Sequence, residues 1–235
     1  FTPRDFHVGY PNLNRFDITT QRYGYSLEHE FSDNLQLRNN LAVTSTVTTD
    51  ERGYGIGSSN NRFIQLESFS AEYSTDNYFG QIDLIGEFET GSISHQVLGG
   101  FDFNRLVNPY EGFQVLNIPD QDIFNPNYDF LPNSVDIVPA FKADTVTQSY
   151  GVYLQDQIAF SDNFRLLVGG RYDWISLDNE IANFGLFGNT VDDPVQNNSA
   201  FSPRVGLVYQ PSDAVSLYAS YSRSFRQSSG FNPDD

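Results

Sequence analysis

Histidine, serine and acidic side chains are the residues of this sequence that could do chemistry, and their spacing matches none of the common catalytic or metal sites. The serines of 216–224 have no histidine and carboxylate partners to activate a nucleophile. The acidic pairs at 50–51 and 192–193 could bind a divalent cation, although solvated loop acids are the simpler interpretation. The histidines, on separate segments without ligand spacing, are His7, His29 and His95. We therefore expect neither an enzyme nor a metal site.

The composition narrows the function further. The chain has 235 residues, a formal net charge of −17 and no cysteine. That charge disfavours nucleic-acid binding, which needs a basic patch, although the acids could simply keep a surface solvated. Without cysteine there are no disulfides or thiolate metal sites, which is compatible with a bacterial cell surface. No apolar run approaches the roughly 20 residues of a membrane-spanning helix, so a membrane location would require strands.

Residues 145–177 predict two long strands joined by a three-residue turn, because apolar and polar side chains alternate along both arms. Alternation alone does not say which face meets water. However, Phe164 and Trp174 lie roughly 33 Å apart along a strand, or roughly 25 Å in height at a tilt of ~40°. This is about the separation of the two aromatic girdles of an outer-membrane barrel. Asp156 interrupts the apolar face, so either a bulge redirects its side chain or it lies near the membrane interface.

The same alternation predicts eight strands, whose connections are alternately short and long. The strands are expected at 16–31, 35–47, 62–89, 92–106, 145–160, 164–177, 200–210 and 215–225, with short turns at 32–34, 89–91, 161–163 and 211–213. The long loops are expected at 50–61, which is rich in glycine and reads as flexible, and at 107–144 and 178–198. Short periplasmic turns and long outer loops are typical of outer-membrane barrels. We predict an all-β, antiparallel, up-and-down transmembrane β-barrel. Since both ends of the chain lie on the long-loop side, these eight strands are expected to be a slice of a larger barrel.

Several of these segments resemble the TonB-dependent siderophore receptors, most closely the ferrichrome and hydroxamate type. The match covers nearly the whole chain, and its motifs occur in the family's order. They are GYPNLNRFD at 9–17, FETGSISHQVLGGFDFNR at 88–105, YGVYLQDQ at 150–157, LLVGGRYDW at 166–174, and SPRVGLVYQP with LYASYSRSF at 202–225.

The resemblance implies a barrel of about 22 strands that is plugged by an N-terminal domain. It implies a multi-pass protein in the lipid of the outer membrane of a Gram-negative-type bacterium, which imports a ferric siderophore with energy from the TonB complex. Residues 1–235 would then be part of the barrel domain, and the plug domain, the TonB box that contacts TonB and the remaining strands would lie outside this sequence. Iron would arrive as the siderophore ligand, and no cofactor is expected.

A siderophore presents a large, partly apolar shell, so its binding site needs flat apolar contacts and a few hydrogen-bond donors. Aromatic residues of the long predicted loops are the candidates, and their alternative role is to pack the loops against one another. The candidates are Tyr110, Phe113, Phe124, Tyr128, Phe130, Phe184 and Phe187. Residues 107–144 carry six acidic side chains against Lys142 alone, which favours a neutral or cationic hydroxamate complex over an anionic catecholate one.

Four arginines are predicted to face the barrel lumen, where they would meet acidic groups. Their partners would be groups of the plug domain or, alternatively, neighbouring lumen acids such as Asp173. These arginines are Arg38, Arg165, Arg171 and Arg204. The alternatives to siderophore uptake are another TonB-dependent cargo, such as haem, cobalamin or a carbohydrate, and a non-gated porin. A barrel enzyme is disfavoured by the absence of an acid, base or nucleophile cluster in the sequence.

Overall fold

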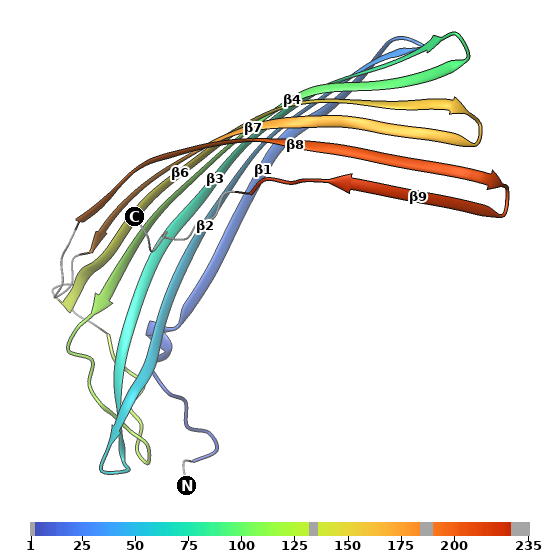
Figure 1. Cartoon of the computed structure of the whole chain (residues 1–235). Helices are drawn as coiled ribbons and strands as arrows, with labels where there is room; N and C mark the ends of the chain where they lie inside the picture. Colours follow the sequence, from blue (N-terminus) through green and yellow to red (C-terminus); the bar gives the residue numbers. More distant parts are fainter. Residues whose placement is uncertain (1–2, 132–135, 184–189, 227–235) are drawn as a thin grey trace.

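A single antiparallel β-sheet dominates the computed structural model, which describes residues 3–131, 136–183 and 190–226 (Figure 1). Its strands are β1 (Arg15–Ser32), β2 (Leu35–Ser59), β3 (Phe63–Thr90), β4 (Ile93–Val115), β5 (Gln121–Asp122), β6 (Ile137–Ser161), β7 (Phe164–Asn183), β8 (Thr190–Ser212) and β9 (Val215–Ser222). A short 3-10 turn, η1 (Pro11–Leu13), precedes β1. Eight strands follow one another in chain order, and the two-residue β5 pairs with β3 beside this path. This confirms the predicted all-β, up-and-down arrangement of eight long strands. The sheet is open, with β1 and β9 at its edges.

Five strands, β2, β4, β6, β7 and β8, extend well beyond the predicted ends on the side away from the short turns, whereas β9 ends at Ser222, short of the predicted residue 225. Residues 50–59 were predicted as a flexible loop, but they belong to β2 and pair with β3 as far as Ser59 opposite Phe63. A bulge lies between Gly55 and Gly57 in this region, where glycine is common. The hairpin is closed by Asn60 and Asn61, which both have φ of 52°.

The two longer predicted loops are shortened in the same way. β4 continues to Val115 and β6 begins at Ile137, so the loop expected at 107–144 is reduced to the connection between these residues. Similarly, β7 continues to Asn183 and β8 begins at Thr190, within the loop expected at 178–198. The prediction was wrong here because these strand ends mix apolar and polar residues without regular alternation, so the periodic signal stops before the backbone pairing does.

The two faces of the sheet differ in chemistry, and we name them by the residues of β7. The apolar face carries Phe164, Leu166, Val168, Tyr172 and Trp174, and the polar face carries Arg165, Arg171 and Asp173. The cross-strand registers carry this assignment to every neighbouring strand.

Large apolar side chains of the apolar face are uncovered. Tyr23 is 69% exposed, and Leu154 is 62% exposed. The few buried apolar residues of the described segments, which include Leu13 and Leu66, do not form a central core under the sheet. A soluble sheet would cover such a face, so this exposure fits a sheet whose apolar side meets lipid. Among the described residues, no helix is both long enough and apolar enough to cross a membrane.

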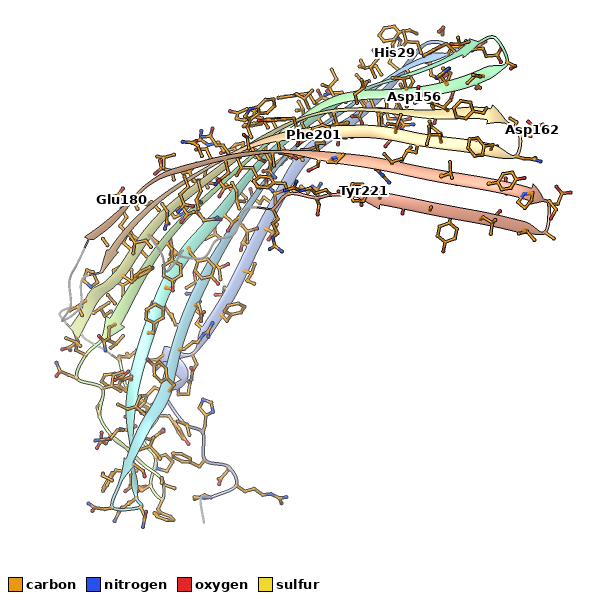
Figure 2. All side chains as sticks on the ribbon, in the orientation of Figure 1. His29, Asp156, Asp162, Glu180, Phe201 and Tyr221 are labelled. Carbon is orange, nitrogen blue, oxygen red and sulfur yellow. The ribbon has the colours of Figure 1, made fainter. Side chains whose placement is uncertain are left out.

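Aromatic residues form two bands on the apolar face. Near the short turns, the rings of Phe160 and Phe164 lie 5.5 Å apart, and those of Phe164 and Tyr209 lie 6.3 Å apart. Farther along the strands, the rings of Tyr172 and Trp174 are 4.6 Å apart. Figure 2 places His29 and Asp162 near the end with the short turns, and Glu180 near the other end. Phe164 belongs to one band and Trp174 to the other.

Asp156 lies on the apolar face and pairs with a histidine of the neighbouring strand. Its Oδ2 lies 2.8 Å from Nδ1 of His95, and the ring of His95 stacks on Phe88 at 4.8 Å. The register of β6 is continuous through Asp156 on both sides, so no bulge redirects the side chain. This rules out the bulge, and the register places Asp156 opposite Val168, four residues along β7 from Phe164 and six from Trp174.

Candidate functional site

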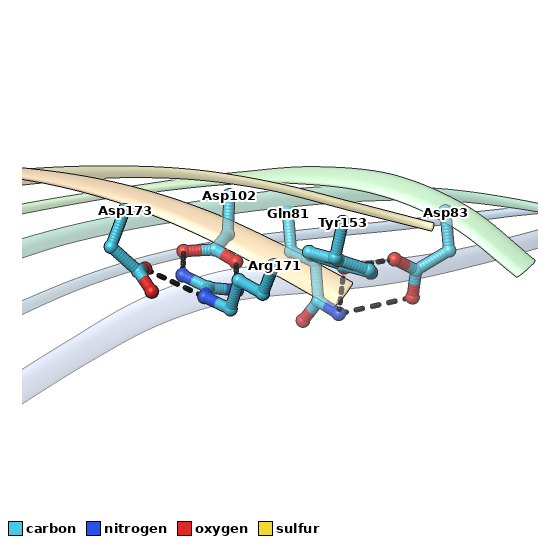
Figure 3. A network of polar contacts seen from close by, with 6 residues as sticks. All are labelled: Gln81, Asp83, Asp102, Tyr153, Arg171 and Asp173. Atoms are coloured by element: carbon cyan, nitrogen blue, oxygen red, sulfur yellow. Dashed lines mark hydrogen bonds and ion pairs between the residues drawn. The ribbon is translucent and has the colours of Figure 1, made fainter. Parts of the chain in front are cut away.

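A network of six polar side chains joins four strands on the polar face (Figure 3). It is built from Gln81 and Asp83 on β3, Asp102 on β4, Tyr153 on β6, and Arg171 and Asp173 on β7. Side-chain alternation brings all six to the same face, because each strand contributes residues of one parity in register. The network consists of two parts that have the same design.

The first part is an arginine that bonds two carboxylates. Arg171 donates from Nε to Oδ1 of Asp173 at 2.6 Å, and from both terminal nitrogens to Asp102, with a distance of 2.9 Å from Nη2 to Oδ1. Asp102 and Asp173 are each opposite Gly151, which lies on the strand between them. A Cβ at Gly151 would overlap the guanidinium of Arg171, so this glycine leaves the space that the side chain crosses. The guanidinium also lies 5.4 Å from the ring centre of Tyr153.

The second part is a tyrosine that crosses a strand in the same manner. The hydroxyl of Tyr153 donates to Asp83 and accepts from Nε2 of Gln81 at 3.0 Å. The amide of Gln81 also donates to Oδ2 of Asp83 at 3.0 Å. Tyr153 and Asp83 are each opposite Gly100, where a Cβ would lie 2.5 Å from Oδ1 of Asp83 and would overlap the tyrosine ring. At both crossings an added Cβ would displace the side chain that passes over the glycine.

The network forms one wall of a hollow of about 860 Å³ on the polar face. Ser202 and Arg204 on β8 line the same hollow. The network holds three carboxylates against one guanidinium, and Arg204 and Arg223 also line the hollow, so the charges of its lining balance. Among the residues that the structure describes, no group of three or more histidine or acidic side chains could hold a metal ion. The hollow is therefore suited to contact a polar or charged partner.

All four arginines predicted to face the lumen lie on the polar face. Arg171 pairs with neighbouring acids of the sheet, which is the alternative that the sequence left open. Nε of Arg38 lies 3.7 Å from a carboxylate oxygen of Glu28, and both side chains are exposed. No ion pair joins Arg165 or Arg204 to any other residue within the described part of the chain.

Aromatic side chains gather on the polar face farther toward the long-loop end. Tyr73 on β3 stacks on Tyr110 on β4 with ring centres 5.4 Å apart, and Tyr110 meets the edge of Phe141 on β6 at 5.7 Å. The ring of Phe69 lies over Gly112, where a Cβ would be 2.7 Å from Cζ of the ring. We call Phe69, Tyr73, Tyr110 and Phe141 the aromatic shelf.

A buried acid lies beside the shelf. Asp50 is opposite Ala71 in the register and accepts a hydrogen bond from Nε of Arg52 at 2.6 Å. The shelf therefore combines flat apolar contact with an arginine whose charge is largely compensated by its own partner.

Of the predicted ligand-binding aromatics, Tyr110 belongs to the shelf. It and Phe113 lie in a strand and not in the predicted loop, and Phe113 is on the opposite face. Phe124 is 60% exposed, the hydroxyl of Tyr128 accepts from the backbone N–H of His7 at 3.1 Å, and Phe130 packs on Tyr10. The structure thus does not bring these last three to the shelf. Phe184 and Phe187 lie outside the described residues.

Sequence reasoning missed Phe69, Tyr73 and Phe141. Tyr73 and Phe69 lie in the part of β3 where both faces are polar or mixed, and Phe141 was assigned to a loop. Phe69 and Tyr73 have odd numbers, as Asp83 does on the same strand, so the strand expected at 62–89 already placed them on the polar face. Phe141 shares its odd number with Tyr153, but this signal requires that β6 begin at Ile137.

The chain matches a known protein family and resembles several named receptors along most of its length. Residues 2–234 match the family model described as TonB dependent receptor-like, beta-barrel. The chain is 29% identical over 256 residues to the ferrichrome outer membrane transporter/phage receptor of Escherichia coli (strain K12), covering 99% of this chain and 33% of that protein. It is 30% identical over 230 residues to the ferrioxamine B receptor of Salmonella typhimurium (strain SL1344), covering 95% of this chain and 30% of that protein. The chain spans about a third of the length of the curated relatives that it matches.

Solved structures with the same fold include importers of ferric complexes. The closed form of the ferric-catecholate import receptor Fiu from Escherichia coli K12 superposes with a TM-score of 0.74 at 20% identity, over 91% of this chain and 34% of that one. The siderophore receptor PiuA from Acinetobacter baumannii superposes with a TM-score of 0.70 at 18% identity, over 92% of this chain and 33% of that one. At these identities the likeness is one of fold.

Proposed function

This chain belongs to the TonB-dependent receptor-like β-barrel family, and from that premise we propose that the whole protein imports a ferric siderophore across the outer membrane of a Gram-negative-type bacterium. The observation that carries the proposal is that relatives named as ferrichrome and ferrioxamine B receptors match along 95% or more of this chain. It favours a siderophore over haem, cobalamin or a carbohydrate as the cargo, and a gated receptor over a non-gated porin. No enzymatic role is proposed, and iron is carried as part of the ligand.

The exposed apolar face supports a position in the membrane. Its aromatic bands would lie at the two interfaces with the outer-membrane lipid. The open edges at β1 and β9 leave backbone groups unpaired, so closure of the barrel would use further strands of the whole protein. Energy would come from the TonB complex through a plug domain and TonB box outside these 235 residues.

The aromatic shelf is our candidate contact for the siderophore. It offers flat apolar surface on the polar face, which faces the lumen in this arrangement, at the end toward the long connections. The Asp50–Arg52 pair beside it leaves little net charge. This favours a neutral or cationic hydroxamate complex over an anionic catecholate complex.

The hollow around the polar network is our candidate contact for the plug domain. Arg204 lines it and has no ion pair within the described part of the sheet, so an acidic group of the plug is a suitable partner. Arg38 and Arg165 lie on the same face toward the short turns and could take similar partners. Arg171 would hold the wall of the hollow through its bonds to Asp102 and Asp173.

Uptake of radioactive iron by cells that express the full-length receptor tests the proposed function. The host should lack its own hydroxamate and catecholate receptors, and the probes are ferrichrome, ferrioxamine B and ferric enterobactin. We expect uptake of at least one hydroxamate complex, little uptake of the catecholate complex, and none in a host without TonB. Absence of uptake for all siderophores by a receptor that reaches the outer membrane would overturn the proposal. Uptake that persists without TonB would indicate a porin.

A further inference from the structure

The connection between β4 and β6 is fastened to the segment that precedes β1 by one buried amide. The side chain of Gln121 is 1% exposed, and its Oε1 accepts from the N–H of Gly9 at 3.0 Å while its Nε2 donates to the carbonyl of Gly9 at 3.1 Å. Gly9 has φ of 100°, which favours glycine, and a Cβ there would lie 3.2 Å from the carbonyl oxygen of Gly53. Both polar ends of a buried side chain are therefore satisfied across 112 residues of sequence.

Several other contacts join the same two segments. The hydroxyl of Tyr10 donates to the carbonyl of Pro119 at 3.2 Å, and the ring of Tyr10 lies 5.0 Å from that of Phe130. Tyr10 and Leu13 form a buried apolar cluster with Leu66 of β3. Ile64, Ile118 and Phe130 pack against this cluster. We call residues 7–13 and 117–131 together the clasp.

The tip of the connection is also fixed to β3. Asp122 is opposite Phe63, and the guanidinium of Arg62 donates twice to Oδ2 of Asp122, at 3.0 and 2.7 Å. The backbone N–H of Ile123 donates to the carbonyl of Arg62 at 2.8 Å. Figure 1 shows both parts of the clasp beside the far end of the β2–β3 hairpin.

The clasp lies on the outside of the sheet wall. Ile64 and Leu66, against which it packs, share a face of β3 with Ile82 and Leu84 of the apolar face. The aromatic shelf is on the other face of the same strands. Closing or opening the clasp therefore does not cover or uncover the shelf directly.

We propose that the clasp is a fixed outer brace of the wall and not a mobile lid, and that it stays closed whether or not a ligand is bound. The brace itself does not depend on the proposed function. A fixed brace would hold Tyr128 and Phe130 away from the siderophore, so that the shelf on the strands makes the contact. This consequence rests on the proposed function.

Hydrogen–deuterium exchange on the full-length receptor tests the brace without any transport. We expect peptides covering 7–13 and 117–131 to exchange slowly, with rates unchanged by saturating ferrichrome or ferrioxamine B. Gln121→Leu should speed exchange in both peptides by about tenfold, since it removes both bonds to Gly9. The matched control is Gln114→Leu, an exposed glutamine at the end of β4, which should leave both rates unchanged. Fast exchange in the parent, or protection that arises only with a ligand, would overturn the proposal.

A reversible lock tests whether the connection must open during transport. Phe63 and Asp122 are register partners in antiparallel strands, and the chain has no cysteine that could interfere with a Phe63→Cys/Asp122→Cys pair. We expect the oxidised and reduced forms to take up the iron complex at rates within about twofold. A large loss of uptake on oxidation that is restored by a reductant would overturn the proposal. If the parent imports no siderophore, the proposed function is wrong. The hydrogen–deuterium exchange rates still show whether the clasp is a fixed brace, because that experiment does not require transport.

Discussion

Arg171 on β7 bonds the carboxylate of Asp102 on β4 across the strand that separates them, passing over Gly151. The same design recurs where Tyr153 reaches Asp83 over Gly100. Both crossings connect strands that share no backbone hydrogen bonds. The polar network therefore adds side-chain hydrogen bonds between strands that are not neighbours in the sheet.

Substitution of the crossing glycine tests this design. Gly151→Ala places a methyl group where the guanidinium of Arg171 lies, so we expect the free energy of unfolding in lipid vesicles to fall by about 1–3 kcal/mol. Gly99→Ala is the matched control, because its Cβ would meet only Cδ1 of Leu154, at 3.6 Å on the apolar face. Denaturant unfolding of the full-length receptor measures both values. Equal values for the two variants would show that the crossing contributes nothing to stability.

Two residues of β4 separate the ligand contact from general packing. Tyr110 belongs to the shelf, whereas Phe113 on the same strand faces the opposite side. We expect Tyr110→Ala to weaken binding of the iron complex by about 1–3 kcal/mol, and Phe113→Ala to change it by less than about 0.5 kcal/mol. Quenching of intrinsic fluorescence by the ferric siderophore gives both affinities. A larger loss of affinity for Phe113→Ala than for Tyr110→Ala would show that the ligand does not bind on the polar face.

The Arg62–Asp122 pair predicts how the clasp responds to acid. The hydrogen bonds from Arg62 lower the pKa of Asp122 below its ordinary value. The pair therefore stabilises the clasp fully above a carboxyl pKa of about 4, and this contribution is lost as the pH falls through the lower pKa of the folded protein.

Pepsin cleavage of the connection measures this dependence. Asp122→Asn should be cut faster than the parent near pH 4.5, and the ratio of the two rates should approach one as the pH falls toward about 2. Because both proteins meet the same pepsin activity at each pH, their ratio removes the pH dependence of the protease. A ratio that stays constant over this range would show that the charge of Asp122 does not hold the connection.

The predictable part of this fold is the part where one face of the sheet is apolar. Between Phe164 and Trp174 the alternation of apolar and polar residues predicts the strand, because successive side chains point to opposite faces. Beyond the girdle, Gly53 and Tyr54 continue β2, where neither face needs to be apolar, so the alternation no longer reports the strand. The shelf residue Phe141 was missed for the same reason, whereas Tyr73 lies within the strand expected at 62–89 and was missed because only aromatic residues of the predicted loops were taken as candidates.

Local sequence patterns could not predict the contacts between segments that are distant in the chain. The bond of Arg171 to Asp173, two residues away on one face, follows from alternation, but its bond to Asp102 depends on the register of β4, β6 and β7. The buried partnership of Gln121 with Gly9 joins two segments that both read as polar loops. No periodicity in either segment indicates it.

The pair formed by His95 and Asp156 provides the last prediction, because it is a polar pair on the apolar face of the sheet. His95→Leu would leave the carboxylate of Asp156 without its partner on that face, where an exposed charge near lipid costs up to about 2 kcal/mol. Replacing both residues by leucine removes the charge together with its partner, so the double variant should be more stable than His95→Leu alone. Unfolding free energies in lipid vesicles are measured for the parent, His95→Leu, Asp156→Leu and the double variant, and together they give the coupling energy. A coupling energy of zero would mean that the 2.8 Å contact does not stabilise the wall and that Asp156 is solvated at the interface.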